Sequence, residues 1–180
     1  SGDPAMLEAF QQNIDIHAVT ASKVYGVPVG LVTREMRAKA KMVNFGIIYG
    51  ISSFGLQQRL NILRAEAAKL IDNYFAEYPK VKEYTQATIE FARQNGYVQT
   101  MTGRRRYLRD INSRSRNAAT AAERLAMNSP IQGTAADILK LAMIRVHREL
   151  RQGGFLTKML LTVHDEIVFD MHKTEVDSVI

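Results

Sequence analysis

The chain has 180 residues, of which 46% are hydrophobic, and this is enough apolar material to bury a core in one domain or two small ones. It contains no cysteine, which excludes disulfides and thiolate metal sites, and no apolar run reaches the ~20 residues that span a bilayer. The net charge of +6 suits a polyanionic partner, although many basic proteins bind no nucleic acid, and the composition predicts a soluble, intracellular protein.

Local signals in the first half of the chain predict a series of helices. Asp3 followed by Pro4 is typical of a helix N-cap and first turn, and Asp15 and Thr33 can cap two further helices. Gly96 fits a glycine that ends a helix in the left-handed conformation. The helices expected from these signals cover residues 4–10, 16–25, 34–50, 54–60, 65–77 and 79–95.

The periodicity changes after Gly96. Residues 97–101 and 106–108 are expected to form a β-hairpin. Two more helices are predicted over residues 114–127 and 134–151, because Ser129-Pro130 lies between them and proline normally ends or breaks a helix.

Two short apolar runs near the end of the chain, residues 158–163 and 167–170, flank His164, Asp165 and Glu166. This arrangement predicts a second hairpin with acidic residues at its turn. The fold class is therefore α+β and predominantly helical, and a boundary near residue 115 separates a helical lobe from an α+β lobe.

The charge is unevenly distributed along the chain. Residues 34–64 and residues 104–116 each carry six basic residues and one acid, for a local net charge of +5. Residues 160–180 carry five acids and one lysine, for a local net charge of −4. Two basic blocks and one acidic block predict phosphate-binding surfaces that face a cation site.

Residues 37–50 carry the most informative pattern. Arg37, Lys41, Phe45 and Tyr49 recur at intervals of four, which stacks two cations and two aromatic rings along adjoining turns of one helix. Cations can hold a polyphosphate, and rings can offer a face to a base. Taken alone, a basic pair at this spacing is also typical of a solvated helix face, and rings at helical spacing are also typical of a core.

These residues, in the pattern Arg-x-x-x-Lys-x-x-Asn-Phe-Gly-x-x-Tyr-Gly, resemble the nucleotide-binding helix of family-A DNA polymerases, the bacterial DNA polymerase I type. The resemblance implies that Arg37 and Lys41 contact the incoming triphosphate, with Lys41 neutralising or protonating the departing pyrophosphate. Phe45 would lie against the sugar and base, and Tyr49 near the template base. His17 would approach the phosphates, although a single histidine is equally typical of a structural, hydrogen-bonded residue.

The acidic turn is a second specific element. Carboxylates at the tip of an apolar hairpin predict a cation, since unpaired carboxylates near a core are costly, whereas an isolated Asp-Glu pair is also typical of a solvated turn. The segment resembles the metal-binding turn of the same family. The resemblance implies that Asp165 ligates Mg²⁺ directly, with two ions in the full enzyme, that Glu166 assists, and that His164 faces the primer terminus.

Arg124, Asn128 and Gln132 recur at intervals of four within residues 123–137. Amide and guanidinium groups can bind the minor-groove acceptors that all base pairs share, and the resemblance assigns these residues to primer–template DNA. Without the resemblance, they would be polar groups buried in a helix. The arginines at 104–106 fit either contact with a duplex backbone or an ion-pair network.

The resemblance extends over all 180 residues and implies that residues 1–115 form the fingers and residues 116–180 part of the palm. It implies template-directed DNA synthesis by two-metal phosphoryl transfer, with primer–template DNA and deoxynucleoside triphosphates as partners. The enzyme would be a monomer in the bacterial cytoplasm, associated with the nucleoid.

The family's other metal-binding aspartate lies in a strand just upstream of the point that matches Ser1. The chain is therefore expected to be a fragment that does not polymerise by itself. The alternative from another functional class is a non-catalytic nucleic-acid-binding helical domain. That alternative explains the basic blocks but not the acidic hairpin.

Overall fold

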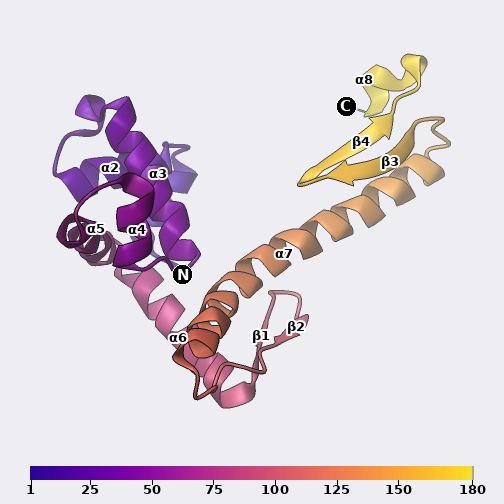
Figure 1. The fold of residues 1–180 in the computed structure, drawn as a ribbon. Coiled ribbons are helices and arrows are strands. Elements are labelled where there is room, and N and C mark those ends of the chain that lie inside the picture. Colours follow the sequence, from indigo (N-terminus) through magenta and orange to yellow (C-terminus); the bar gives the residue numbers. More distant parts are fainter. Residues whose placement is uncertain (180) are drawn as a thin grey trace. The chain divides into compact units, whose positions relative to one another are not determined.

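A computed structural model describes residues 1–179. Most of these residues are helical, and two short two-stranded sheets interrupt the helices (Figure 1). The elements are α1 (Pro4–Gln11), α2 (Ile16–Tyr25), the 3-10 helix η1 (Val29–Leu31), α3 (Arg34–Ile48), α4 (Ser53–Leu60), α5 (Arg64–Glu77), α6 (Pro79–Asn95), β1 (Tyr97–Gln99), β2 (Arg105–Tyr107), α7 (Arg116–Gln152), β3 (Lys158–Val163), β4 (Glu166–Asp170), the 3-10 helix η2 (Lys173–Glu175) and α8 (Val176–Val179). The predicted α+β, predominantly helical class is confirmed.

The predicted caps begin and end the helices of the first half. The side chains of Asp3, Asp15 and Thr33 accept hydrogen bonds from backbone N–H groups in the first turns of α1, α2 and α3. Gly26 and Gly96 end α2 and α6 with φ values of 67° and 75°, which are left-handed and favour glycine. These ends depend on local chemistry, and this is why the sequence predicts them well.

The chain divides into two compact units, and the division differs from the predicted boundary near residue 115. The first unit comprises residues 1–98 and 106–128, and the second comprises residues 99–105 and 129–180. The division falls inside α7, between residues 128 and 129, whereas the predicted boundary lies just before this helix begins at Arg116. The assignment of fingers and palm to these parts of the chain stays a prediction.

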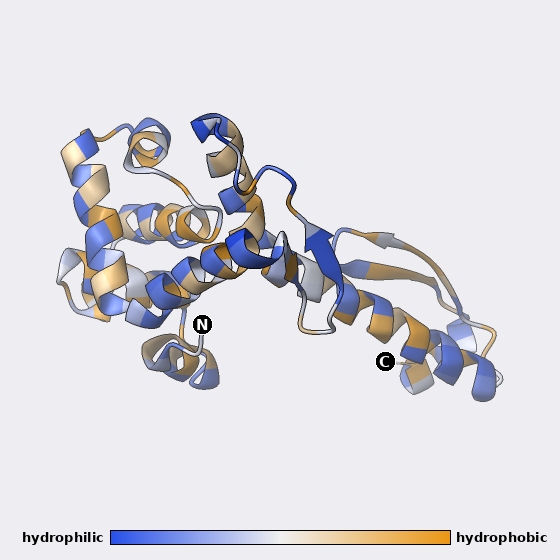
Figure 2. Cartoon of the chain, turned by 90° about the horizontal axis from the view of Figure 1, so that it is seen from below, coloured by the Kyte–Doolittle hydropathy of each residue, from blue (hydrophilic) through white to orange (hydrophobic). Residues whose placement is uncertain are grey.

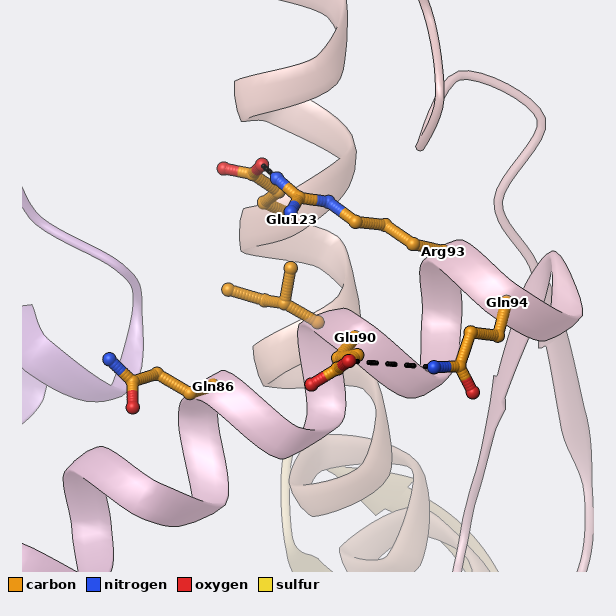
Figure 3. A pocket seen from close by; sticks show the side chains of 6 residues that line it. Gln86, Glu90, Arg93, Gln94 and Glu123 are labelled. Carbon is orange, nitrogen blue, oxygen red and sulfur yellow. Dashed lines mark hydrogen bonds and ion pairs between the residues drawn. The ribbon is translucent and has the colours of Figure 1, made fainter.

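Two apolar clusters form the core of the first unit. The larger one includes Val43 and Ile47 of α3, Leu56 of α4 and Tyr74 of α5. The smaller one, between α6, β1 and α7, consists of Ala92, Val98, Leu108, Ile111, Ala122 and Ala126. Beside it, the guanidinium of Arg93 on α6 forms an ion pair with Glu123 on α7 at 2.5 Å (Figure 3).

The second unit is held together differently. Among its described residues, Leu150 is the only buried hydrophobic one. Polar contacts take the place of a core: the Glu175 carboxylate accepts hydrogen bonds from the N–H groups of Leu156 and Thr157 and from the Thr157 hydroxyl. Hydrophobic residues occur along α7, β3 and β4 (Figure 2), and many are exposed, including Ile138, Leu141, Ile144, Leu160 and Leu161.

The prediction of two helices around Ser129-Pro130 is wrong, because α7 is a single helix of 37 residues with Pro130 inside it (Figure 1). A proline in a helix interior removes a backbone donor and costs about 3 kcal/mol. The following turn is fastened by other groups: the Thr134 hydroxyl donates to the Pro130 carbonyl at 2.6 Å, and the Arg104 guanidinium donates to the Gly133 carbonyl at 3.1 Å. These contacts help the helix continue past the proline.

The predicted C-terminal hairpin is confirmed. β3 and β4 pair antiparallel, with Lys158 opposite Asp170 and Val163 opposite Glu166. His164 lies in the connecting turn with a left-handed φ of 56°. Across residues 1–179, no helix is both long and apolar enough to cross a membrane.

Candidate functional site

The face of α3 that carries the predicted array is open to solvent. Arg37 and Lys41 are exposed, and Phe45 and Tyr49 keep 45% and 46% of their surface accessible. The opposite face, formed by Ala40, Val43 and Ile47, is buried in the core. The two rings are therefore not core residues, and α3 presents two cations and two rings outward from a fixed support.

Arg37 has a partner that the sequence pattern did not reveal. The Asp15 carboxylate caps α2 through Oδ1 and pairs with Arg37 Nε through Oδ2 at 2.5 Å. The hydrogen bond from Arg37 is the main cause that holds the pKa of Asp15 below its ordinary value. Asp15 thus fastens α2 to α3 and orients the guanidinium. The sequence predicts the capping role of Asp15 but not its ion pair with Arg37.

His17 lies beside the array, as the resemblance implied. Its ring centroid is 5.6 Å from that of Phe45, and Lys41 Nζ lies 6.0 Å from the Phe45 ring centroid. Burial lowers the pKa of His17, the Asp15 carboxylate opposes this shift, and the cations of Arg37 and Lys41 reinforce it. The imidazole is therefore biased toward its neutral form. Contact with a ligand stays a prediction for His17.

Tyr49 ends α3 and shares a surface hollow with Arg124 of α7. Gly50 and Arg59 line the same hollow. Gly50 has a left-handed φ of 65°, and a Cβ there would collide with the side chain of Met127. The backbone at Gly50 thus lies close to α7. This brings Tyr49 of the α3 array beside Arg124 of the α7 motif, and Arg59 adds a second cation to the hollow.

The third predicted block lies on α7. Arg124 and Gln132 are exposed, but the Oδ1 atom of Asn128 is buried and has no hydrogen-bond partner among residues 1–179. An amide oxygen in that position is not available to a groove. The proposed DNA contacts of these three residues stay predictions, and only those of Arg124 and Gln132 start from accessible side chains.

The acidic turn is exposed, which overturns one argument made from the sequence. His164, Asp165 and Glu166 all lie open to solvent, so their charges do not face a core and need no cation to offset burial. Within residues 1–179 there is no group of three or more His, Asp or Glu side chains that could hold a metal ion. The role of Asp165 as a magnesium ligand therefore rests on the family resemblance and stays a prediction.

The structure answers one open question about the arginine run. Arg104 forms an ion pair with Asp137 at 2.8 Å, and the Thr102 hydroxyl donates to the same carboxylate at 2.6 Å. Arg104 therefore belongs to an ion-pair network within the second unit. We call this set, Thr102, Arg104 and Asp137, the α7 latch.

Comparison with known proteins gives a consistent result. Residues 1–180 match the family described as DNA polymerase family A. The chain is similar to a DNA polymerase I of Caldicellulosiruptor bescii, with 52% identity over 99% of this chain and 21% of the relative. It is similar to the DNA polymerase I of Chloroflexus aurantiacus, with 52% identity over 98% of this chain and 19% of the relative. The chain thus spans about a fifth of the length of these curated relatives.

A solved structure resembles the fold closely. It is the POL domain of Pol1 from M. smegmatis in complex with DNA primer-template and dNTP. The TM-score is 0.93 at 40% sequence identity, over 98% of this chain and 31% of that chain. The exposed array on α3, the hairpin with its acidic turn and the match along the whole sequence agree. The chain belongs to DNA polymerase family A.

Proposed function

We propose that the chain forms the nucleotide-binding surface and part of the metal-binding site of a DNA-directed DNA polymerase. The polymerase would add deoxynucleotides to a primer 3′ end by two-metal phosphoryl transfer. The exposed face of α3 is the observation that carries this proposal. A polymerase domain of similar fold bound to primer–template and dNTP supports it.

The two cations of the α3 array, Arg37 and Lys41, have different electrostatic settings. Arg37 forms an ion pair with Asp15, whereas Lys41 has no acidic partner among the described residues. A cation without a protein counter-ion gains most from an approaching triphosphate. We therefore assign Arg37 to orienting the polyphosphate, and Lys41 to stabilising the charge that develops on the departing pyrophosphate.

The rings extend the surface beyond the phosphates. Phe45, next along the face from Lys41, would lie against the sugar and base. Tyr49 would lie near the template base, with Arg124 beside it in the same hollow. Arg124 and Gln132 would contact primer–template DNA.

Asp165 is proposed as a ligand to Mg²⁺, with Glu166 as a neighbouring acid and His164 near the primer terminus. When bound, the metal neutralises charge on the transferring phosphoryl group. The family resemblance places a second metal-binding aspartate upstream of the point that matches Ser1, so this chain would supply only one of the two carboxylates. We therefore expect the 180-residue chain alone not to extend a primer, and extension by the purified chain with Mg²⁺ and four nucleotides would contradict this.

The sharpest test compares two lysines of α3 in a polymerase that carries this chain. Lys41→Ala should lower kcat/KM for deoxynucleotides by about 100-fold, within the range for removing one group that stabilises developing charge. Lys39 lies some 200° around the helix from Lys41 and pairs with Glu35 at 2.9 Å, so Lys39→Ala is the matched control and should change little. Equal losses for the two variants would mean that the exposed face is only a solvated helix surface.

A further inference from the structure

A line of buried hydrogen bonds runs behind the exposed face of α3. Tyr78 Oη lies 3.2 Å from Thr20 Oγ1, and Thr20 Oγ1 donates to Asn44 Oδ1 at 3.1 Å. Asn44 Nδ2 lies 2.9 Å from His17 Nδ1. Thr20, Asn44 and Tyr78 are all buried, whereas His17 is half-buried at the edge of the array.

The direction of each bond follows from the number of hydrogens available. Thr20 has one hydroxyl hydrogen, which goes to Asn44, so Tyr78 must donate to Thr20. Asn44 presents its amide nitrogen to His17, and an amide nitrogen only donates. His17 Nδ1 must therefore accept. A neutral imidazole that accepts at Nδ1 carries its proton on Nε2.

Asn44 selects this tautomer, because the charged groups near His17 among the described residues do not bind its ring nitrogens. The Asp15 carboxylate is occupied, since Oδ1 binds backbone N–H groups of α2 and Oδ2 binds Arg37. Arg37 and Lys41 are cations and disfavour a charged imidazole. His17 Nε2 has no protein partner among residues 1–179, so its N–H is available to a ligand.

We propose that Asn44 is a positioning residue that holds His17 as the neutral Nε2–H tautomer, so that the imidazole donates a hydrogen bond to the polyphosphate bound by Arg37 and Lys41. This inference rests on the proposed function of α3. It also accounts for an asparagine on the buried side of the same helix whose exposed side carries the phosphate contacts. Thr20 and Tyr78 act one step further back, by fixing which end of the Asn44 amide faces His17.

The tautomer can be observed directly in the 180-residue chain by ¹H–¹⁵N correlation of the histidine side chains at pH 7.5. The expected result is a bare Nδ1 and a protonated Nε2 on His17. Asn44→Asp should reverse this pattern, because an ionised carboxylate only accepts hydrogen bonds and therefore favours a proton on His17 Nδ1. The new anion should also raise the pKa of His17.

A second pair of variants protects the test from a folding defect in Asn44→Asp. Thr20→Val keeps the volume but removes the donor to Asn44 Oδ1, so the amide can turn and the tautomers of His17 should mix. Thr20→Ser keeps the hydroxyl and should restore the bare Nδ1. A protonated Nδ1 in the unmodified chain, or no difference between Thr20→Val and Thr20→Ser, would overturn the proposal.

Titration with inorganic triphosphate separates this inference from the proposed function. The expected result is a shift of the His17 Nε2–H resonance that is lost in Lys41→Ala. Triphosphate binding that depends on Lys41 but leaves His17 unmoved would overturn the role of His17 and leave the function of α3 standing. Triphosphate binding that does not depend on Lys41 would overturn both the role of His17 and the proposed function of α3.

Discussion

The two units of the chain support their candidate site residues in different ways. In the first unit, the array on α3 stands on a buried apolar face, and a capping carboxylate and a buried hydrogen-bond line hold the groups beside it. In the second unit, the acidic turn is exposed, and the α7 latch and the hydrogen bonds to Glu175, rather than an apolar core, hold the elements together. The array on α3 is thus held by packing against a core, whereas the acidic turn is held by the pairing of β3 and β4.

This difference affects how much of each ligand contact would appear as affinity. Groups that are already oriented lose little conformational freedom when a ligand binds, so more of each contact appears as affinity. Exposed carboxylates keep their hydration and gain little until a multivalent cation replaces it. We therefore expect substitutions behind the α3 array to act mainly through packing and orientation, and substitutions at the acidic turn to act through charge.

The largest effect should come from the exposed turn. In a polymerase that carries this chain, Asp165→Asn should lower kcat by at least about 1,000-fold while DNA affinity changes little, because a metal ligand loses its charge but not its volume. Asp170→Asn, on β4 opposite Lys158, is the matched control and should be nearly neutral. Unchanged turnover in Asp165→Asn would leave the turn with no role beyond closing the hairpin.

The next effect should separate the buried core of the first unit from the exposed apolar residues of the second. Leu56 is fully buried in the first unit, and Leu56→Ala should lower its free energy of unfolding by about 2 to 5 kcal/mol. Leu160 is 58% exposed in the second unit, and Leu160→Ala should change stability by less than about 0.5 kcal/mol. Native-state hydrogen exchange reads each unit separately. Similar losses for both leucines would remove the contrast between a core and a latched surface.

Phe45 tests the sugar end of the α3 array. Phenylalanine has no hydroxyl, so a nucleotide without its 3′-OH leaves a polar position unfilled, and Phe45→Tyr should supply an oxygen there. A hydrogen bond to a charged phosphate is worth roughly 1.5 to 3 kcal/mol, or one to two orders of magnitude. The ratio of dideoxy to deoxy incorporation should rise accordingly. An unchanged ratio with normal synthesis would mean that Phe45 does not face the sugar.

The smallest expected effect is a local loss of stability in the second unit at acidic pH. Hydrogen bonds from Thr102 and Thr100, with Arg104, hold the pKa of Asp137 below its ordinary 3.8. Hydrogen bonds from the Leu156 N–H and the Thr157 hydroxyl and N–H likewise hold the pKa of Glu175 below 4.5. Because both folded pKa values are depressed, the stability that Asp137 and Glu175 contribute is fully present above these ordinary values and is lost as the pH falls through the folded ones.

Hydrogen exchange can follow this loss. The Met101 amide is bonded to Thr134 near the α7 latch, and the Thr157 amide is bonded to Glu175. Their protection factors should fall between about pH 5 and pH 2 before those of Val43 and Ile47 in the first core. If the core amides of α3 lose protection first, the second unit does not depend on its carboxylates.

Features that depend on neighbouring residues could be predicted from the amino-acid sequence. Caps at Asp15 and Thr33 act within one helical turn, and a spacing of four places Lys41 and Phe45 on one face whatever surrounds the helix. The β3–β4 hairpin likewise follows from two short apolar runs around a polar turn. These predictions succeed because their physical causes lie within a few residues.

Features whose causes lie far apart in the chain become visible only once the chain is folded. The Asp15–Arg37 and His17–Asn44 contacts join residues 22 and 27 positions apart, and nothing in a local pattern specifies such a partner. The same holds for α7, which continues through Pro130 with its next turn bonded to Arg104. Exposure of the acidic turn also depends on what packs around it. Local propensity is worth about 1 to 3 kcal/mol at such positions, and distant contacts of similar size can reverse it.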